Sequence, residues 1–340
     1  MAKLKIGVIG CGSIAQHRHL PEYAANLNAE IVAVCDKDRE RVQEVAETYG
    51  AKAYTDYREL LQNEGLDAVS VCTPNALHAP ISIAALDAGK HVLCEKPMAT
   101  SHEEALAMIA AAEKSGKFLM IGHNQRLMPP HKKAKEILDS GVLGRVLTFR
   151  TTFGHAGPEM WSVEGAGGWF FQKQQAFIGA MGDLGVHKAD LLRFLLGEEI
   201  VEVGAFVGTL AKQNTDVDDN AVCIVKTESG AIGTLVASWT YQPKEDNSTV
   251  FYCEKGTLRL AEDPTYGVIV EFANGERALY QVGAVATNEK QTTSGVIDAF
   301  IEHILTGTRP AISGEEGYKS LKVILAALES AETGRIVRVE

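Results

Sequence analysis

Short apolar runs alternate with amphipathic stretches over the first 122 residues of the chain. The runs cover residues 4–10, 30–36, 67–73, 91–96 and 118–123. Apolar runs of this length, separated by segments with helical periodicity, are typical of strand–helix–strand units. The pattern therefore predicts an α/β domain in residues 1–122, built on a doubly wound parallel sheet.

The pattern changes after about residue 145, where longer strand-like segments are separated by turn signals. These segments cover residues 145–154, 221–242 and 249–262, and they predict a largely antiparallel sheet in an α+β domain. Between the two halves, residues 129–144 have the features of a helix entered through proline and closed by glycine. We expect this helix to be a hinge between a first domain, 1–122, and a second domain, 123–340.

Composition narrows the classes of partner. The 340 residues are 46% hydrophobic, which is enough for two ordinary cores, and the formal net charge is −11. An acidic chain is repelled on average by nucleic acid and by anionic membranes, so we expect neither as a partner. A small molecule is the expected partner instead. No signal sequence or spanning segment is evident, which favours the cytoplasm. The six cysteines lack metal-ligand spacing, and no metal site is expected.

The first chemical motif is a glycine-rich turn, "GVIGCGSIA", that follows an apolar run and opens a helix. Gly10 allows a tight turn, Gly12 lets the backbone approach a diphosphate, and the small Ala15 permits close packing of helix on strand. The helix N-terminus, at Ser13 and Ile14, offers amide donors to phosphate oxygens. In a strand–helix–strand context this motif predicts dinucleotide binding.

The acidic residue Asp36 ends the next predicted strand, 21 residues after Ala15. A carboxylate there accepts hydrogen bonds from a ribose hydroxyl and repels a 2′-phosphate, so we expect NAD as the cofactor. Lys37, Arg39 and Arg41 follow directly and are able to pair with a phosphate, which keeps NADP open.

A second informative stretch lies at residues 179–198, "GAMGDLGVHKADLLRFLLGE". If it is helical from about Asp183, then Asp183 and His187 share one face and Asp190 lies one turn further on. An imidazole between carboxylates can be held in one tautomer and can accept a proton near neutral pH. The alternative interpretation of such a pair is an ion pair on a helix surface.

Five segments together resemble the glucose-fructose oxidoreductase/inositol dehydrogenase family, known as Gfo/Idh/MocA. They are "GCGSIA" (10–15), "CTPNALH" (72–78), "EKP" (95–97), "GHNQR" (122–126) and "GDLGVH" (182–187), in the family's order. The resemblance implies a Rossmann domain followed by an α+β domain with an open, largely antiparallel sheet. It implies a cleft between the domains for nicotinamide and a sugar or polyol. An open sheet with helices on one face leaves a broad apolar surface on the other, so we expect a homodimer or homotetramer.

The resemblance also implies roles for single residues. His187 matches the family's general base, Asp183 would orient it or bind a substrate hydroxyl, and Lys96 would stabilise the developing alkoxide and relay the proton. Glu95 would lie under the cofactor, and Pro97 would set the loop, a cis bond being one option. The residues expected on the cofactor side are Gly10, Gly12, Ser13, Ile14, Asp36, Lys37, Thr73, Pro74, Asn75, His78, Glu95, Lys96 and Pro97.

The substrate side is expected to combine family positions with a variable loop at residues 153–175. Besides Lys96, Asp183 and His187, the candidates are His123, Asn124, Arg126, His155, Trp161, Trp169 and Lys173. The resulting hypothesis is hydride transfer between a sugar or polyol CH–OH group, inositol-like among others, and a nicotinamide cofactor. The alternatives are a glycoside hydrolase that oxidises its substrate transiently and a non-catalytic regulator.

Overall fold

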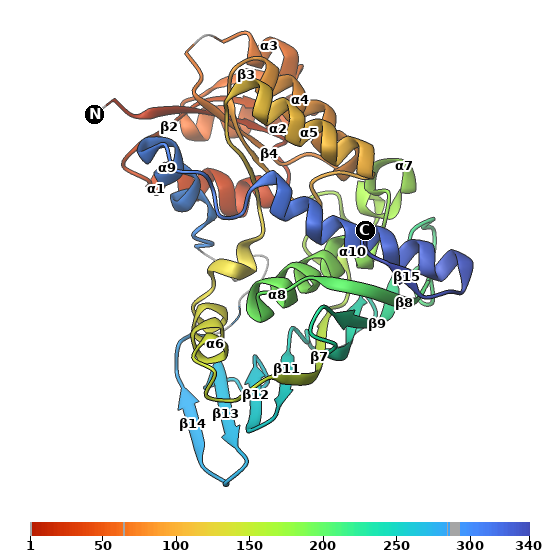
Figure 1. Ribbon diagram of the computed structural model, residues 1–340. Coiled ribbons are helices and arrows are strands. Elements are labelled where there is room, and N and C mark those ends of the chain that lie inside the picture. Colours follow the sequence, from red (N-terminus) through yellow and green to blue (C-terminus); the bar gives the residue numbers. More distant parts are fainter. Residues whose placement is uncertain (1, 64, 284, 286–292) are drawn as a thin grey trace.

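The computed structural model describes residues 2–63, 65–283, 285 and 293–340. It contains two sheets, one toward each end of the molecule in the view of Figure 1. The first, near the N-terminus, has the six strands β1 Leu4–Ile9, β2 Ala29–Cys35, β3 Lys52–Tyr54, β4 Ala68–Val71, β5 His91–Cys94 and β6 Leu119–Ile121. Their order is β3-β2-β1-β4-β5-β6, and all neighbouring pairs that the sheet contains are parallel. This is the doubly wound Rossmann order, so the predicted fold of this domain is confirmed.

Two helices of this domain begin at residues whose side chains cap them. Asp38 accepts two backbone N–H groups at the start of α2 Arg39–Tyr49, and Gly50 ends it in the left-handed conformation. Ser101 caps α5 His102–Ser115 in the same way. The remaining elements are the π-turn η1 Ala15–His19, α1 Leu20–Ala25, α3 Tyr57–Leu61, the 3₁₀ turn η2 Asn75–Leu77 and α4 His78–Asp87.

The second sheet has nine strands in the order β14-β13-β12-β11-β7-β10-β9-β8-β15. Only β7 and β10 run parallel among the pairs described, so the prediction of a largely antiparallel sheet is confirmed. The strands are β7 Val146–Gly154, β8 Ile200–Gly208, β9 Asn220–Thr227, β10 Ile232–Ser238, β11 Thr249–Cys253, β12 Gly256–Leu260, β13 Val268–Phe272, β14 Arg277–Tyr280 and β15 Val337–Arg338.

Helices cover one face of this sheet. They are α6 Pro129–Asp139, α8 Val186–Leu196 and α10 Gly314–Thr333, and Figure 1 shows α8 and α10 between the two sheets. The predicted hinge helix is shorter than expected, because α6 ends at Asp139 and the chain then turns through Gly141 and Gly144, both with positive φ. No helix among the described ranges is both long and apolar enough to cross a bilayer.

The opposite face of the sheet leaves apolar side chains exposed. Alternation along β9 buries Ala221, Cys223 and Val225 but leaves Val222 and Ile224 outward, Ile224 being 60% exposed. Strand pairing places Phe206 of β8 beside Val222, and Phe206 is 88% exposed. An apolar, uncovered sheet face is unusual on an isolated chain and is typical of an interaction surface.

The chain returns to the first domain after completing most of the second sheet. Helix α9 Val296–Thr306 places Val296, Ile297 and Phe300 in the core of the parallel sheet, and Figure 1 shows it beside α1. Helix α10 then runs from β6 to β8 and contacts both domains. The contacts of α9 and α10 hold the two domains together. The division of the chain at residue 122 remains a prediction.

Candidate active site

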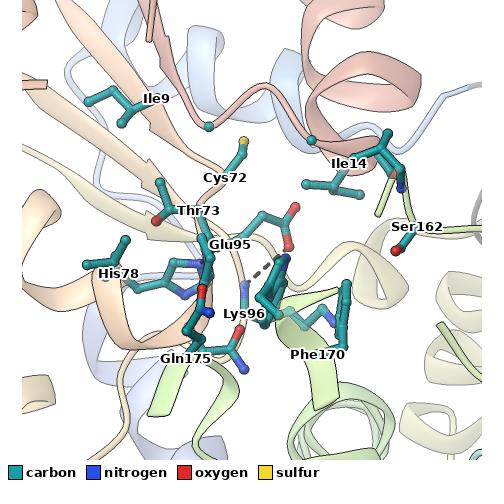
Figure 2. Close-up of a pocket in the computed structure, with 18 of the residues that line it drawn as sticks. Ile9, Ile14, Cys72, Thr73, His78, Glu95, Lys96, Ser162, Phe170 and Gln175 are labelled. Carbon is teal, nitrogen blue, oxygen red and sulfur yellow. Dashed lines mark hydrogen bonds between the residues drawn. The ribbon is translucent and has the colours of Figure 1, made fainter. Parts of the chain in front are cut away.

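A cavity of about 740 Å³ lies where the carboxyl ends of the parallel strands meet the second domain. Figure 2 shows Thr73, Glu95 and Lys96 of the Rossmann strand ends on one side, with Ser162 and Phe170 of the second domain opposite. The predicted cofactor-side residues that line it are Gly10, Gly12, Ser13, Ile14, Asp36, Lys37, Thr73, Pro74, Asn75, His78, Glu95, Lys96 and Pro97. The whole predicted set therefore borders one space.

The glycine-rich turn has the geometry that a diphosphate requires. Gly10 has φ +93°, and a Cβ on it would lie 2.5 Å from the carbonyl oxygen of Cys72, so only glycine fits. A Cβ on Gly12 would meet nothing within 4 Å, which leaves open space at the amino end of the helical segment that follows. The residues present therefore fit a dinucleotide.

Asp36 directly follows β2 and lies beside the glycine-rich turn. Its two carboxylate oxygens accept the backbone N–H groups of Cys11 and Asp38, at 2.7 and 2.9 Å. The guanidinium of Arg41 lies 3.6 Å from the same carboxylate and is not a free phosphate ligand, because Asp38 and Glu164 lie equally close to it. This arrangement fits an unphosphorylated ribose.

Asn75 and His78 have structural partners as well as a place in the lining. The Asn75 amide donates to the carbonyl oxygen of Ala176 in the second domain, at 2.9 Å. The ring nitrogens of His78 lie 2.8 and 2.7 Å from the carbonyl oxygens of Thr73 and Pro97. Because these contacts join the loops after β4 and β5, His78 fixes the shape of this side of the cavity. The peptide bond before Pro97 is cis.

Glu95 is held as a buried carboxylate. Burial alone would raise its pKa, but the hydrogen bond from His19 at 2.9 Å and the charges of His19, Lys96 and Arg18 lower its pKa to about 2. His19 is fixed in turn by Ser70, at 3.1 Å, so the carboxylate has one preferred position. Glu95 is therefore a fixed negative charge in the lining of the cavity.

Lys96 connects the two domains at the cavity floor. Its ammonium donates to the carboxylate of Asp183 at 2.9 Å and to the Asp183 carbonyl oxygen at 3.1 Å. The other carboxylate oxygen accepts the indole N–H of Trp239, at 3.1 Å. Both oxygens of Asp183 are thus engaged, and the ammonium retains one of its three N–H donors.

The segment that carries Asp183 is not the helix predicted from residue 183. Residues Met181–Gly185 form a π-helical turn, and α8 begins at Val186. The structure gives no hydrogen bond between Asp183 and His187, so Asp183 does not orient the imidazole as expected. It holds Lys96 instead.

His187 lies in the cavity lining as a neutral imidazole. Burial, followed by the charge of Lys96, lowers its pKa well below the ordinary value of 6.5. Its Nδ1 has no hydrogen-bond partner among the described residues, and the ring packs against Phe153, with centroids 5.8 Å apart. A neutral ring nitrogen in a cavity is able to accept a proton.

Asp190 does not flank His187, contrary to the predicted arrangement. The guanidinium of Arg126 donates two hydrogen bonds of 2.7 Å to it, and Ser320 donates a third. Arg126 is therefore turned into the protein and is absent from the cavity lining, as is His123, whose Nε2 lies 3.8 Å from Asp190. Of the "GHNQR" candidates, Asn124 does line the cavity.

The variable loop supplies aromatic rings to the lining. Trp169 stacks on Phe170 with centroids 3.9 Å apart, and Trp161 meets Phe170 edge-on at 5.1 Å. His155 lines the cavity, and its Nδ1 accepts the N–H of Gly157 at 3.0 Å, so its Nε2 carries the hydrogen when the ring is neutral. Lys173 is exposed and lies outside the lining, with its backbone N–H bound to Asp216.

Several lining or supporting residues were not predicted from the sequence. Arg18 and Gln125 line the cavity, and each has a buried side-chain atom without a partner among the described residues. Trp239 reaches Asp183 from the end of β10. The position of Arg18 six residues after Gly12 was a signal that could have found it, whereas Trp239 has no local signal.

A Rossmann sheet, a diphosphate turn and a second domain that closes over the strand ends define a two-domain, nicotinamide-dependent oxidoreductase. The chain belongs to the Gfo/Idh/MocA family of oxidoreductases. Residues 4–123 match its NAD-binding Rossmann domain, and residues 131–259 match its C-terminal domain.

Similar proteins of known sequence or structure span the whole chain. Myo-inositol 2-dehydrogenase of Thermotoga maritima is 30% identical over 99% of both chains. The crystal structure of aldose-aldose oxidoreductase from Caulobacter crescentus, complexed with glycerol, has a TM-score of 0.85 at 30% identity and covers 99% of both chains. Levoglucosan dehydrogenase in complex with NADH and levoglucosan has a TM-score of 0.87 at 28% identity, over 99% of both chains.

Proposed function

We propose that this enzyme transfers a hydride between a CH–OH group of a neutral sugar or polyol and NAD. One observation supports this proposal most directly. The Lys96–Asp183 ion pair and the neutral His187 line the same cavity as the diphosphate turn. Removal of a hydride from a carbinol carbon requires that the hydroxyl proton leave as well, and these groups are the ones suited to take it.

The cofactor would be held along the strand ends. Asp36 would accept from the adenosine ribose, and the amides that follow Gly12 would donate to the diphosphate. Thr73, Asn75, Glu95 and Pro97 would then border the nicotinamide half, which supplies the hydride acceptor. NAD is preferred over NADP because the Asp36 carboxylate accepts from an unphosphorylated ribose and repels a 2′-phosphate, while the nearby guanidinium of Arg41 already faces Asp38 and Glu164.

His187 would accept the hydroxyl proton of the substrate, since its lowered pKa keeps the ring unprotonated at neutral pH. Lys96 would donate its remaining N–H to the same oxygen and stabilise the negative charge that develops there. Asp183 would hold the ammonium in place through its 2.9 Å ion pair, itself fixed by Trp239. An acid/base set of this kind has no use in a non-catalytic regulator.

The substrate would be a hydroxyl-rich ring. Trp169, Phe170 and His155 border the cavity on the side of the second domain, and aromatic faces stack on the C–H surfaces of sugars. The similar proteins named above act on or bind inositol, glycerol and levoglucosan according to their names, which are all uncharged polyols or sugars. Inositol is one candidate among these.

We also propose that two copies associate through the uncovered sheet face that carries Phe206, Val222, Ile224 and Ile232. A homodimer or homotetramer would remove these side chains from water. The cytoplasmic location expected from the sequence likewise remains a prediction.

The experiment that tests the function is a screen of inositols, aldoses, anhydro sugars and amino sugars with NAD and NADP. NADH is followed by absorbance and the sugar product is quantified. We expect one NADH for each substrate molecule consumed. Turnover of many glycoside molecules without NADH accumulation would show a hydrolase, and no turnover of any compound in either direction would contradict the proposal.

A further inference from the structure

Lys188 is a fully buried amine that the proposed hydride transfer does not use. It follows His187 in α8, has no exposed surface and does not line the cavity. Its ammonium donates to the carbonyl oxygen of Asn247 at 3.0 Å and to the hydroxyl of Thr249, in β11, at 3.4 Å. Neither partner is a carboxylate, and a buried ammonium held in this way costs free energy. This cost points to a role beyond packing.

The side chain of Phe153, near the end of β7, connects Lys188 to the cavity. The centroid of its ring lies 5.8 Å from the Nζ of Lys188, within the range of a cation–π contact. The same centroid lies 5.8 Å from that of His187 and 5.9 Å from that of His155. Phe153 and both histidines line the cavity. One ring therefore contacts the buried amine, the proposed proton acceptor and a second histidine of the site.

Lys188 is positively charged in the acidic range. Burial lowers its pKa from 10.5 to about 7, and the charges of Asp246 and Glu245, in the loop before β11, oppose this decrease. His131 of α6 is affected by the same charge. Burial and Lys188 lower the pKa of His131 to about 3, so His131 adds no positive charge of its own. Lys188 is therefore an ammonium below about pH 7.

His187 lies within reach of this charge. Burial is the largest cause of its lowered pKa, followed by Lys96, His123, Arg18 and Lys188. His123 is itself neutral at neutral pH, because burial lowers its pKa to about 4. Lys96 and Arg18 line the cavity, where a bound ligand changes their surroundings. Lys188 is the cation of this group that acts from outside the cavity.

Resting on the proposed function, we propose that Lys188 is a positioning residue of the active site. Through Phe153 it fixes the rings of His155 and His187, and its two hydrogen bonds hold the start of α8 against β11. Its charge acts together with that of Lys96 to keep His187 ready to accept a proton. Lys188 touches neither substrate nor cofactor, so its removal should change kcat and the pH profile and leave the affinity for NAD unchanged.

A double-variant comparison tests the connection through Phe153. Lys188→Met keeps an unbranched side chain and removes the ammonium, whereas Phe153→Leu removes the ring. Each change should lower kcat on the order of tenfold, because a misplaced imidazole accepts the proton less efficiently. The double variant should lose about as much as one single variant, since both changes act through the same contact. An unchanged kcat for Lys188→Met, or a loss of about a hundredfold in the double variant, would overturn the connection.

The pH profile of kcat/KM tests the charge, and a purely structural role would not move it. Lys188→Met removes a positive charge that disfavours the imidazolium form of His187, so the acid limb should move to higher pH. The expected shift is roughly half a unit, the order of magnitude for one charge acting through the protein interior. Lys188→Gln, with a different neutral side chain, should move the limb in the same direction. A limb that stays in place in both variants would overturn the role of the charge.

Lys90→Met is the matched control. Lys90 is also buried and donates to backbone carbonyl oxygens, those of Asn63 and Leu66, but it does so in the first domain. Its replacement should change neither kcat nor the acid limb. Shifts equal to those of Lys188→Met would show that the loss of any buried ammonium has this effect, and would overturn the proposal.

A carbon-13 NMR titration of the histidine rings in the free enzyme measures the pKa of His187 without substrate. The signal is assigned by its absence from His187→Gln, and the pKa should be higher in Lys188→Met than in the wild type. Failure of the wild-type enzyme to turn over any compound would contradict the proposed function. An unchanged pKa of His187 in Lys188→Met would instead contradict the role of the Lys188 charge.

Discussion

Burial decides the protonation state of His187 and so the pH range in which it is able to act as a base. Burial and the charge of Lys96 lower its pKa well below 6.5, so the unprotonated form is present above that lowered pKa and is lost as the pH falls through it. We expect kcat/KM for sugar oxidation to stay flat down to pH 6.5 and to fall only at lower pH. A pH profile of kcat/KM checks this, and His187→Gln should lack the acid limb. An acid limb centred above pH 6.5 would contradict the role of His187.

Asp36 determines the expected preference for NAD. Asp36→Ala removes the acceptor for an unphosphorylated ribose and at the same time a negative charge that repels a 2′-phosphate. We expect the dissociation constant of NAD to rise far more than that of NADP, which calorimetric titration of both cofactors measures. Equal weakening of both cofactors would show that Asp36 does not discriminate between them.

The sequence pointed to candidate residues that lie within short, recognisable motifs. Lys96 and Glu95 were found through the "EKP" segment of the family resemblance, and the glycine turn was found because each glycine has a separate reason to be there. The contacts of Asp183 were not predicted, because Trp239 is 56 residues away from it and only the fold brings them together. Arg126 was assigned to the substrate for a related reason, since its partner Asp190 is 64 residues away in sequence.

The π-turn before α8 is the element on which Asp183 depends. Asp218 accepts the N–H groups of Gly179 and Met181, at 2.7 and 2.8 Å, and so holds the start of this turn. Helical periodicity predicted a helix from residue 183 because it does not distinguish a π-turn from an α-turn. Strand β3 was missed for another reason, since three residues do not make a recognisable apolar run.

Gly179 is where this turn is most sensitive to substitution. A Cβ on Gly179 would lie 1.8 Å from the carbonyl oxygen of Asp218, so Gly179→Ala must displace the backbone. We expect a loss of about 1–3 kcal/mol in the free energy of unfolding, together with a lower kcat because Asp183 moves. Urea denaturation and steady-state kinetics test this. Gly208→Ala is the control, since a Cβ there would meet nothing within 4 Å, and equal stability of the two variants would contradict the close contact.

The whole molecule contains two sheets that are joined by α9 and α10. One face of the second sheet is apolar, and none of the described residues covers it. The strand-like segments of the second half predicted the antiparallel sheet, and the apolar face expected on an open sheet predicted an oligomer. The packing of α9 against the core of the parallel sheet could not be predicted from the sequence. The apolar face of a helix is able to pack on either sheet, and the local sequence does not indicate which. Contacts of this kind are decided by tertiary packing.

Association through the uncovered face is open to a direct test. Ile224→Asp places a charge at a position 60% exposed in the single chain, and a carboxylate there would have to be desolvated in the proposed interface. We expect the wild-type enzyme to be a dimer or tetramer at micromolar concentration and the variant to be monomeric by light scattering. Leu27→Asp, at an exposed position of the first domain, should leave the assembly unchanged. A monomeric wild-type enzyme would show the proposed interface to be wrong.

The proposed function requires that Lys96 and His187 act on the same proton in a sugar oxidation that uses NAD. It is tested most directly by the turnover of Lys96→Met, His187→Gln and the double variant on the substrate that the screen identifies, with NAD affinity measured in parallel. Each single change should lower kcat by about two to four orders of magnitude with NAD affinity nearly intact, and the double change should cost far less than the sum of the two. Near-normal turnover of Lys96→Met, or fully additive losses in the double variant, would contradict the claim.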